Sequence, residues 1–576
     1  MGYMESYREW LENPYFDEET KEELRRIEGD EKEIRERFYA DLEFGTAGLR
    51  GVIGAGTNRM NMYTVRKATQ GLANYIISQN GQKKGVAIAF DSRRMSPEFA
   101  DEAACCLAAN GIKAYVFESL RPTPELSFAV RELGCISGIN ITASHNPPEY
   151  NGYKVYWEDG AQITPPHDTG IMDEVRAVVD YATVKTMSRE DAEQAGLYET
   201  IGAAIDDRYM EELKKNVLHP NCIKEVEKDL RIVYTPLHGT GNIPVRRVLK
   251  ELGFTNVFVV PEQELPDGEF PTVGYPNPEA REAFELALTL AKEKDADLVL
   301  ATDPDADRLG VYVKDSKSGE YICLTGNMSG SFLADYEIGQ KLALEGSLPD
   351  DGMLVKTIVT TNLVDAIAKY YHINVVECLT GFKWIGREIL KTETTGKGQY
   401  LFGFEESYGC LIGTHARDKD GIVASMALCE AAAYYKKRGK TLWDAMIDMY
   451  EKYGYYKDDV ISITHKGLEG LEKIKSTMEG LRANPPVQFG DYEVTAVRDY
   501  EKDTIKNLRT GEEGTTGLPK SNVLYFELTS DAWLCVRPSG TEPKIKIYFG
   551  VVGESMDDAN EKSAQLAQIV RELFAD

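Results

Sequence analysis

A serine in a turn directly after an apolar segment is the first candidate for chemistry. Ser144 lies in the run Thr-Ala-Ser-His-Asn-Pro, and the segment before it, with Ile139 and Ile141, is typical of a strand. Catalytic groups of α/β proteins commonly lie at such strand ends. His145 cannot be assumed to be the base for this serine, because adjacent side chains of an extended chain point in opposite directions. Ser, Asn and Pro also favour turns, so the run by itself fits a capped turn equally well.

Three carboxylates follow a second apolar segment at alternate positions. Asp303, Asp305 and Asp307 come directly after residues 296–302 and precede Arg308. Unpaired carboxylates this close would repel one another, and a site with only oxygen ligands selects Mg²⁺ or a similar hard cation. We therefore predict a metal site with a position open to a phosphoryl oxygen. A solvated acidic turn and a phosphatase loop with an aspartyl nucleophile are the alternatives.

A glutamate and a serine lie on a third, glycine-flanked loop. The run Gly-Phe-Glu-Glu-Ser-Tyr-Gly contains Glu405 and Ser407. Paired acceptors and donors of this kind suit the neighbouring hydroxyls of a sugar. A capped helix start explains the same run equally well.

Two further loops combine arginine with glycine. Near the C-terminus an arginine, two hydroxyls and a glycine turn form a phosphate cradle, with a hairpin turn as the alternative. Its residues are Arg537, Ser539, Gly540 and Thr541. Near the N-terminus Arg50 lies in Phe-Gly-Thr-Ala-Gly-Leu-Arg-Gly, where glycines let backbone amides approach a ligand. A flexible loop is the alternative there.

The elements around these loops repeat one pattern of strand, helix and strand. Such βαβ units indicate α/β domains with parallel strands. The units are predicted at 85–91, 97–110 and 113–117, at 230–235, 244–252 and 257–260, and at 353–359, 363–371 and 374–378. From about residue 455 the pattern becomes β-rich, with helices at 468–481 and 557–574, which indicates a smaller α+β domain. We predict four domains, at 1–215, 216–325, 326–450 and 451–576.

Length and composition exclude several classes of protein. A chain of 576 residues is too long for one core. Its net charge of −28 argues against a nucleic-acid partner, and no apolar run approaches the ~20 residues that span a bilayer. The nine cysteines form no C-x-x-C pair, so a reducing cytoplasm is expected. Residues 1–40 are predicted to be helical, with 22–37 a mostly solvated segment. The oligomeric state stays open.

Together the motifs resemble the α-D-phosphohexomutase superfamily, the phosphoglucomutases and phosphomannomutases. Four runs appear in that family's order over nearly the whole chain: Thr-Ala-Ser-His-Asn-Pro, Asp-Pro-Asp-Ala-Asp-Arg, Gly-Phe-Glu-Glu-Ser and Arg-Pro-Ser-Gly-Thr-Glu-Pro. The resemblance implies a heart-shaped enzyme with three similar α/β domains, which have mixed sheets, and a smaller C-terminal α+β domain.

The resemblance also implies a role for each matched residue. Ser144 would carry a phosphoryl group, and one of its oxygens would join Asp303, Asp305 and Asp307 around Mg²⁺. Glu405 and Ser407 would grip sugar hydroxyls, while the cradle of Arg537, Ser539, Gly540 and Thr541 would bind the phosphate that is not transferred. Arg50, His145, Lys154 and Arg308 would surround the group in transfer. Lys154 is the first candidate for proton transfer and His145 the second. Thr380, Gly381 and Lys383 match a loop that influences sugar specificity, with Lys383 at the substrate phosphate.

The activity implied is that of a phosphoglucomutase. It would interconvert glucose 1-phosphate and glucose 6-phosphate, with glucose 1,6-bisphosphate as intermediate and activator. Pentose or mannose phosphates are alternative substrates in the same class, because they present similar hydroxyls to Glu405 and Ser407. A phosphatase with an aspartyl nucleophile and an inactive relative that serves as a binding protein are alternatives from other classes.

Overall fold

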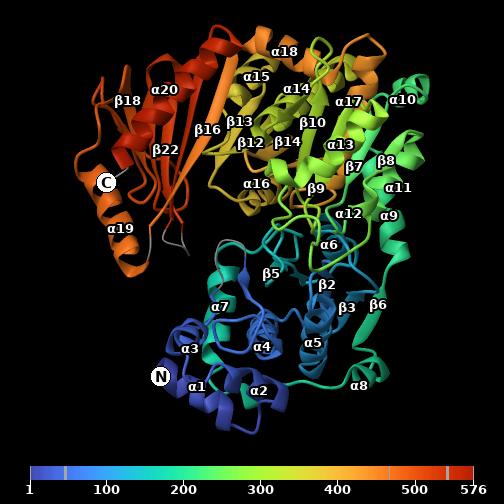
Figure 1. Ribbon diagram of the computed structural model, residues 1–576, viewed down its shortest axis with the longest axis vertical. Helices are drawn as coiled ribbons and strands as arrows, with labels where there is room; N and C mark the ends of the chain where they lie inside the picture. Colours follow the sequence, from blue (N-terminus) through green and yellow to red (C-terminus); the bar gives the residue numbers. More distant parts are fainter. Residues whose placement is uncertain (1, 44–47, 466, 540–543, 575–576) are drawn as a thin grey trace. The chain divides into compact units, whose positions relative to one another are not determined.

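The computed structural model describes residues 2–43, 48–465, 467–539 and 544–574. It divides into two compact units. Figure 1 labels their helices and strands. The first unit comprises Met1–Leu324, Ile385–Lys397 and Tyr408–Thr441, and the second comprises Thr325–Trp384, Gly398–Ser407 and Leu442–Asp576. Within the described ranges, no helix has both the length and the apolar character that crossing a membrane requires.

The first unit begins with three amphipathic helices around an aromatic cluster. They are α1 (Tyr3–Glu12), α2 (Glu18–Arg26) and α3 (Glu31–Phe38). Most residues of 22–37 are exposed or half-buried, as predicted, but Leu24, Ile34 and Phe38 are buried with Trp10 in one core. The sparse apolar positions therefore attach this segment to the rest of the unit, because each lies on the inner face of its helix.

A six-stranded mixed sheet positions the serine loop. The strand order is β1-β5-β4-β2-β3-β6, with β6, β3, β2 and β4 parallel and with β5 antiparallel to both β4 and β1. Helices α5 and α6 pack on the central strands. The strands are β1 (Leu49–Val52), β2 (Val86–Phe90), β3 (Ala114–Phe117), β4 (Ser137–Ile141), β5 (Tyr150–Trp157) and β6 (Tyr198–Ile201). The helices are α4 (Met62–Ser78), α5 (Ser96–Ala109), α6 (Thr123–Glu132), α7 (His167–Ala177) and α8 (Arg189–Gln194).

A five-stranded mixed sheet in the same unit positions the aspartate loop. Its order is β11-β10-β9-β7-β8, with β9, β7 and β8 parallel and β10 and β11 antiparallel additions. Its strands are β7 (Ile232–Thr235), β8 (Val257–Val259), β9 (Leu298–Thr302), β10 (Leu309–Lys314) and β11 (Tyr321–Leu324). The helices are α9 (Ala203–Lys214), α10 (Pro220–Val226), α11 (Asn242–Leu252), α12 (Pro261–Glu264) and α13 (Glu285–Lys294).

The strand β15 (Gly409–Ile412) and the helix α17 (Gly421–Lys436) also belong to the first unit. Helix α17 packs against α10, α11, β9 and β10. Its side chains are buried almost throughout its length, in keeping with its nearly unbroken apolar sequence. A segment late in the chain thus reaches the sheet that carries the aspartates.

The second unit combines a parallel sheet with an antiparallel one. Strands β13-β12-β14 are parallel neighbours, whereas β16-β23-β22-β21-β18-β19-β20 are antiparallel, with β17 paired to β18. The strands are β12 (Gly352–Thr357), β13 (Asn374–Cys378), β14 (Gln399–Glu405), β16 (Tyr455–Thr464), β17 (Gln488–Phe489), β18 (Tyr492–Asp499), β19 (Thr504–Asn507), β20 (Glu513–Gly514), β21 (Leu524–Leu528), β22 (Trp533–Pro538) and β23 (Lys544–Gly553). The helices are α14 (Gly326–Glu345), α15 (Leu363–Tyr371), α18 (Leu442–Tyr453), α19 (Gly467–Ala483) and α20 (Met556–Phe574). Helix α16 (Phe382–Thr395) begins in this unit, and from Ile385 onward it belongs to the first unit.

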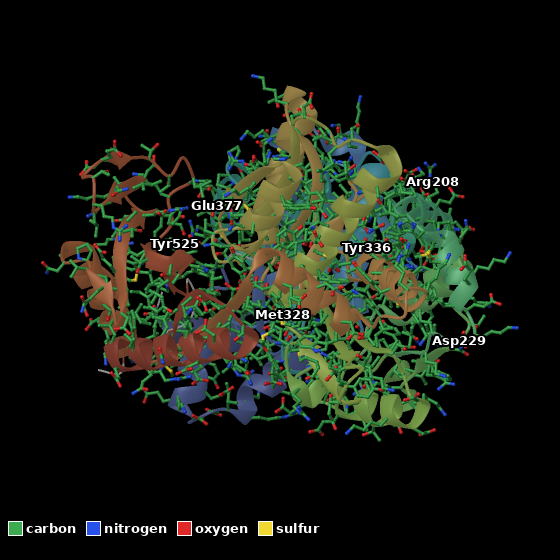
Figure 2. All side chains as sticks on the ribbon, turned by 90° about the horizontal axis from the view of Figure 1, so that it is seen from above. Arg208, Asp229, Met328, Tyr336, Glu377 and Tyr525 are labelled. Carbon is green, nitrogen blue, oxygen red and sulfur yellow. The ribbon has the colours of Figure 1, made fainter. Side chains whose placement is uncertain are left out.

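The two sheets of this unit share a core and an ion-pair network. Ile358 and Val359, which follow β12, pack with Trp533 of β22. Arg498 of β18 donates to Glu377 of β13 at 2.8 Å, and Glu377 is labelled in Figure 2. These contacts hold the C-terminal sheet to the parallel one.

The three predicted βαβ units are confirmed. They correspond to β2-α5-β3, β7-α11-β8 and β12-α15-β13, with parallel strands in each. The β-rich tail is also confirmed, as an antiparallel sheet with α19 and α20. The fold class of three α/β domains with a smaller C-terminal α+β domain is therefore correct.

Candidate active site

Ser144 lies in a tight turn just beyond the end of β4. Its backbone adopts the left-handed region, with φ +52°, and its amide donates to the Thr142 hydroxyl at 2.8 Å. The side chain is buried, and its hydroxyl donates to Asp303 Oδ2 at 2.7 Å. The turn thus places the serine oxygen directly against the first aspartate of the acidic loop.

The side chain of His145 points toward Ser144, which differs from the direction expected from the sequence. Adjacent side chains point in opposite directions only in an extended backbone, and the positive φ of Ser144 makes the backbone non-extended here. His145 Nδ1 lies 3.2 Å from Ser144 Oγ. Burial, together with the nearby positive charges of Arg308 and Arg50, holds the pKa of His145 well below its usual range. The imidazole is therefore neutral at neutral pH and is in hydrogen-bond reach of the serine.

A buried arginine holds the serine loop from behind. Arg93 is fully buried, and the Phe270 ring covers it at 5.0 Å. Its terminal nitrogens donate to four backbone carbonyls, those of Ser144 at 2.5 Å, Asn146 at 2.5 Å, Pro147 at 2.8 Å and Tyr150 at 3.1 Å. A rigid planar fork with five donors can satisfy these acceptors together.

We expect Arg93→Lys to lower kcat about 100-fold, because an ammonium keeps the charge but cannot hold all four carbonyls, so the serine shifts. Arg94→Lys is the matched control, since the neighbouring Arg94 is half exposed and pairs with Glu269 at 3.0 Å. Initial rates would be compared, with circular dichroism to check the fold. Equal rates for the two variants would contradict a positioning role for Arg93.

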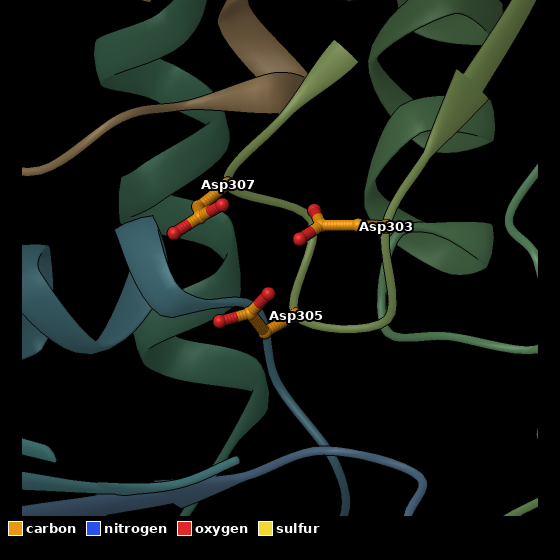
Figure 3. A group of neighbouring side chains, drawn as sticks. All are labelled: Asp303, Asp305 and Asp307. Carbon is orange, nitrogen blue, oxygen red and sulfur yellow. The ribbon is translucent and has the colours of Figure 1, made fainter. Parts of the chain in front are cut away.

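The three aspartates form one buried cluster at the end of β9 (Figure 3). One carboxylate oxygen from each of Asp303, Asp305 and Asp307 lies within 4.8 Å of the others. Ala306, between the last two, has φ +50°, and this left-handed residue turns the loop so that the carboxylates converge. This spacing is small enough for one cation to contact all three.

Hydrogen bonds leave two carboxylate oxygens of the cluster available. Asp305 Oδ2 accepts from Lys154 Nζ at 2.9 Å, and Asp303 Oδ1 accepts from the Arg308 amide at 3.0 Å. Asp305 Oδ1 and Asp307 Oδ1, in contrast, are buried and have no hydrogen-bond partner among the described residues. Buried carboxylate oxygens normally have partners, so this pair fits a hard divalent cation.

The charges of the cluster also favour a bound divalent cation. Burial and the charge of Asp305 raise the pKa of Asp303 and that of Asp307. Burial also acts to raise the pKa of Asp305, but the charge of Lys154 and the side-chain hydrogen bonds of Asp303, Lys154 and Thr123 together hold that pKa below its usual range. Like charges that are buried this closely are unfavourable, and a cation would offset their repulsion.

The predicted basic residues surround the serine and the aspartates. Lys154 is buried on β5, opposite Asn140 of β4, which places its ammonium at the aspartates. Arg50 lies on β1 and donates to Asn146 Oδ1 at 2.9 Å. Arg308 donates to Glu279 at 2.7 Å, and its Nε lies 3.8 Å from Asp307 Oδ1. All of the residues predicted for phosphoryl transfer thus lie together in the first unit.

Lys419 is a member of this site that the sequence-based prediction missed. Its Nζ lies 3.2 Å from Asp307 Oδ2 and 3.3 Å from Asp418 Oδ1. Gly409 makes room for it, because a Cβ at position 409 would meet Lys419 Cδ at 2.0 Å. The sequence feature that could have indicated Lys419 is the charged run Arg-Asp-Lys-Asp-Gly, which directly precedes an apolar helix.

The sugar-loop residues lie in the second unit. Glu405 ends β14 and is buried, and Ser407 Oγ donates to its Oε1 at 3.1 Å. Burial and the charge of Glu405 raise the pKa of Glu406 to about 7, while Arg537 and Lys546 act to lower it. Glu406 is therefore within electrostatic range of Arg537, so this unit brings the predicted sugar loop and part of the phosphate cradle together.

The remaining predicted residues also belong to the second unit. Thr380 and Gly381 precede α16, and Lys383 Nζ lies 5.6 Å from the centre of the Trp384 ring. Arg537 is on β22, and the Ser539 amide donates to the Lys544 carbonyl at 2.7 Å. Gly540 and Thr541 lie outside the described residues.

A buried serine that faces a carboxylate cluster and is surrounded by cations, on α/β domains, is typical of a phosphotransferase. Family models of the phosphoglucomutase/phosphomannomutase type match four successive parts of the chain. The α/β/α domain I model matches 41–181, domain II matches 207–319, domain III matches 325–453 and the C-terminal domain matches 491–569. The chain belongs to this family, within the α-D-phosphohexomutase superfamily, and is an intramolecular phosphotransferase. The four domain boundaries given above stay a prediction.

Individual relatives agree with this assignment. The phosphoglucomutase of Staphylococcus aureus (strain MRSA252) is 37% identical over 532 residues, which are 92% of this chain and 93% of that protein. A phosphoglucomutase of Staphylococcus epidermidis is 36% identical over 544 residues, with 92% and 95% covered. In fold, the chain is similar to parafusin, a phosphoglucomutase from Paramecium, with a TM-score of 0.67, 18% identity and 93% and 96% of the chains covered. A phosphoglucomutase/phosphomannomutase family protein from Burkholderia thailandensis has a TM-score of 0.63 and 20% identity, with 92% and 97% covered.

Proposed function

We propose that this chain is a phosphoglucomutase, which interconverts glucose 1-phosphate and glucose 6-phosphate through a phosphorylated Ser144. The single observation that carries the proposal is the 2.7 Å contact between the Ser144 hydroxyl and Asp303 in a buried acidic cluster. The phosphoglucomutases that are 36–37% identical over 92% of the chain support glucose phosphates as the substrate class.

The residues of the cluster suit the transfer of a phosphoryl group. Asp303, Asp305 and Asp307 would hold Mg²⁺, with a phosphoserine oxygen as a further ligand. Bound there, Mg²⁺ would offset the negative charge of the phosphoryl group in transfer. Arg50 and Arg308 would bind the phosphoryl oxygens, because both are half-buried guanidinium groups in the same unit.

The reaction requires proton transfer at the sugar hydroxyl. Phosphoserine donates its phosphoryl group to the free hydroxyl of the sugar phosphate, which gives a bisphosphate and a free Ser144. The bisphosphate then turns over, and Ser144 takes back the other phosphate. Lys154 is the first candidate to accept and return the hydroxyl proton, and the neutral His145, 3.2 Å from Ser144 Oγ, is the second.

The residues predicted to bind the sugar and the second phosphate lie in the second unit. Glu405 and Ser407 would bind the sugar hydroxyls in both orientations, and Thr380, Gly381 and Lys383 would contribute to sugar specificity. Arg537, Ser539, Gly540 and Thr541 would bind the phosphate that is not transferred. Glucose 1,6-bisphosphate would serve as intermediate and activator. A reducing cytoplasm stays the predicted location, since the nine cysteines form no C-x-x-C pair.

We expect glucose 1-phosphate to be converted fastest when glucose, mannose and ribose 1-phosphates are offered in parallel. Phosphorus NMR would follow each reaction in the presence of Mg²⁺ and a trace of glucose 1,6-bisphosphate. A preference for the ribose ester would make the chain a phosphopentomutase, and a preference for the mannose ester would make it a phosphomannomutase. Release of inorganic phosphate without isomerisation would instead support the phosphatase with an aspartyl nucleophile.

A further inference from the structure

Thr123 joins the sheet that carries the serine to the loop that carries the aspartates. It is the first residue of α6 and is fully buried. Its amide donates to the Asp305 carbonyl at 2.9 Å, and its hydroxyl donates to Asp305 Oδ2 at 2.9 Å. One residue therefore binds both the backbone and the side chain of the central aspartate. The same Oδ2 also accepts from Lys154 Nζ at 2.9 Å.

Asn140 fixes the direction of the Thr123 hydroxyl. Asn140 is fully buried on β4, and its Nδ2 donates to Thr123 Oγ1 at 2.7 Å. A hydroxyl has one proton, and a carboxylate can only accept. Because the amide hydrogen occupies a lone pair of Oγ1, the threonine proton is committed to Asp305. The result is a one-way chain of hydrogen bonds from the amide through the hydroxyl to the carboxylate.

This chain of bonds determines which oxygen of Asp305 is available. Thr123 and Lys154 saturate Oδ2, whereas Oδ1 is buried and has no hydrogen-bond partner among the described residues. Free rotation of the carboxylate would exchange the two oxygens and break both bonds. Asp307 Oδ1 likewise accepts no hydrogen bond from the described residues, although Arg308 Nε lies 3.8 Å away. Groups that orient a metal ligand in this way contribute strongly to metal affinity.

We propose that Thr123, oriented by Asn140, is a positioning residue that directs Asp305 Oδ1 toward the bound metal ion. The inference rests on the proposed metal site of the three aspartates. It assigns a role in the affinity of that site to two uncharged residues, Thr123 on α6 and Asn140 on β4. Neither residue contacts the substrate or the reacting atoms in this role.

The test is a direct measurement of metal affinity. Mn²⁺ would be titrated into the full-length protein, without sugar phosphate, and free Mn²⁺ would be followed by electron paramagnetic resonance. Thr123→Val keeps the volume and the amide bond to Asp305 but removes the hydroxyl. We expect the Kd for Mn²⁺ to rise about tenfold to a hundredfold. Thr123→Ser, which restores the hydroxyl, should recover most of the affinity.

Two further variants separate this role from general destabilisation. Thr69→Val is the control, because it removes another buried threonine hydroxyl, on α4. That hydroxyl bonds to the Val65 carbonyl and to the Tyr153 hydroxyl. The Kd for Mn²⁺ should stay unchanged. Asn140→Leu should weaken binding less than Thr123→Val, and the double variant should be no weaker than Thr123→Val alone, since Asn140 acts through Thr123.

The outcomes distinguish this inference from the metal site itself. If the wild-type protein and Asp307→Asn bind Mn²⁺ equally, or neither binds it, the site on the aspartates is wrong and this inference falls with it. If the wild type binds Mn²⁺, Asp307→Asn does not, and Thr123→Val binds as the wild type does, only the positioning role is wrong. Equal loss in Thr123→Val and Thr69→Val would also overturn it.

Discussion

Ser144→Ala is expected to lower kcat for glucose 1-phosphate isomerisation roughly 10⁴- to 10⁶-fold, the range seen when an enzyme loses its nucleophile. Without the serine oxygen no phosphoenzyme forms, so neither half of the reaction can proceed. The loop itself should survive, because Arg93 holds it through backbone carbonyls, which alanine retains. Alanine also adds no bulk at a position where the hydroxyl contacts Asp303 and His145.

Two measurements would check this result. Initial rates would be recorded with Mg²⁺ and glucose 1,6-bisphosphate, and intact-protein mass spectrometry would look for the added phosphoryl group. Ser137→Ala is the matched control, since Ser137 is a buried serine of β4 whose hydroxyl donates to the Tyr156 carbonyl at 2.6 Å. We expect the control to retain phosphorylation and most of the rate. Substantial activity in Ser144→Ala would instead favour an aspartyl nucleophile.

Lys154→Met is expected to reduce both turnover and stability. The ammonium lies 2.9 Å from Asp305 Oδ2 and 4.0 Å from Asp307 Oδ2, and all three side chains are buried. Removal of one partner from a buried ion pair costs about 3–5 kcal/mol of unfolding free energy, because the other charge stays buried without its counter-ion. Loss of a general acid or base lowers kcat about 10²- to 10⁴-fold.

Metal dependence separates these two effects. Thermal unfolding would be followed in EDTA and in excess Mg²⁺, and we expect the loss of stability to be largest in EDTA, since a bound cation would offset the unpaired carboxylates. Lys154→Arg keeps the charge and should preserve stability better than turnover. Lys84→Met is the control, because Lys84 forms an exposed pair with Glu158, worth at most about 1 kcal/mol. Equal loss in EDTA and Mg²⁺ would argue that Lys154 does not face the metal.

Much of the architecture could be predicted because its signals are local. The apolar runs before Ser144 and before Asp303 identify β4 and β9, and the motifs identify the loops that follow them. The carboxyl ends of strands in α/β sheets are where ligands bind, so a serine and an acidic loop at such ends could be assigned to one site. For the N-terminal helices the sequence predicts only the exposed face of residues 22–37, and the structure shows that Leu24, Ile34 and Phe38 are buried.

Other features depended on the tertiary structure. The contacts of Thr123 with Asp305 and of Lys419 with Asp307 join segments that are 182 and more than 100 positions apart. No local pattern encodes which side chain meets which across two packed domains, because the outcome depends on how their sheets are placed. The position of His145 was decided by a single left-handed residue, Ser144. Backbone conformation at one such residue reverses the direction of a neighbouring side chain, and only the packing around the loop, with Arg93 at its centre, selects that conformation.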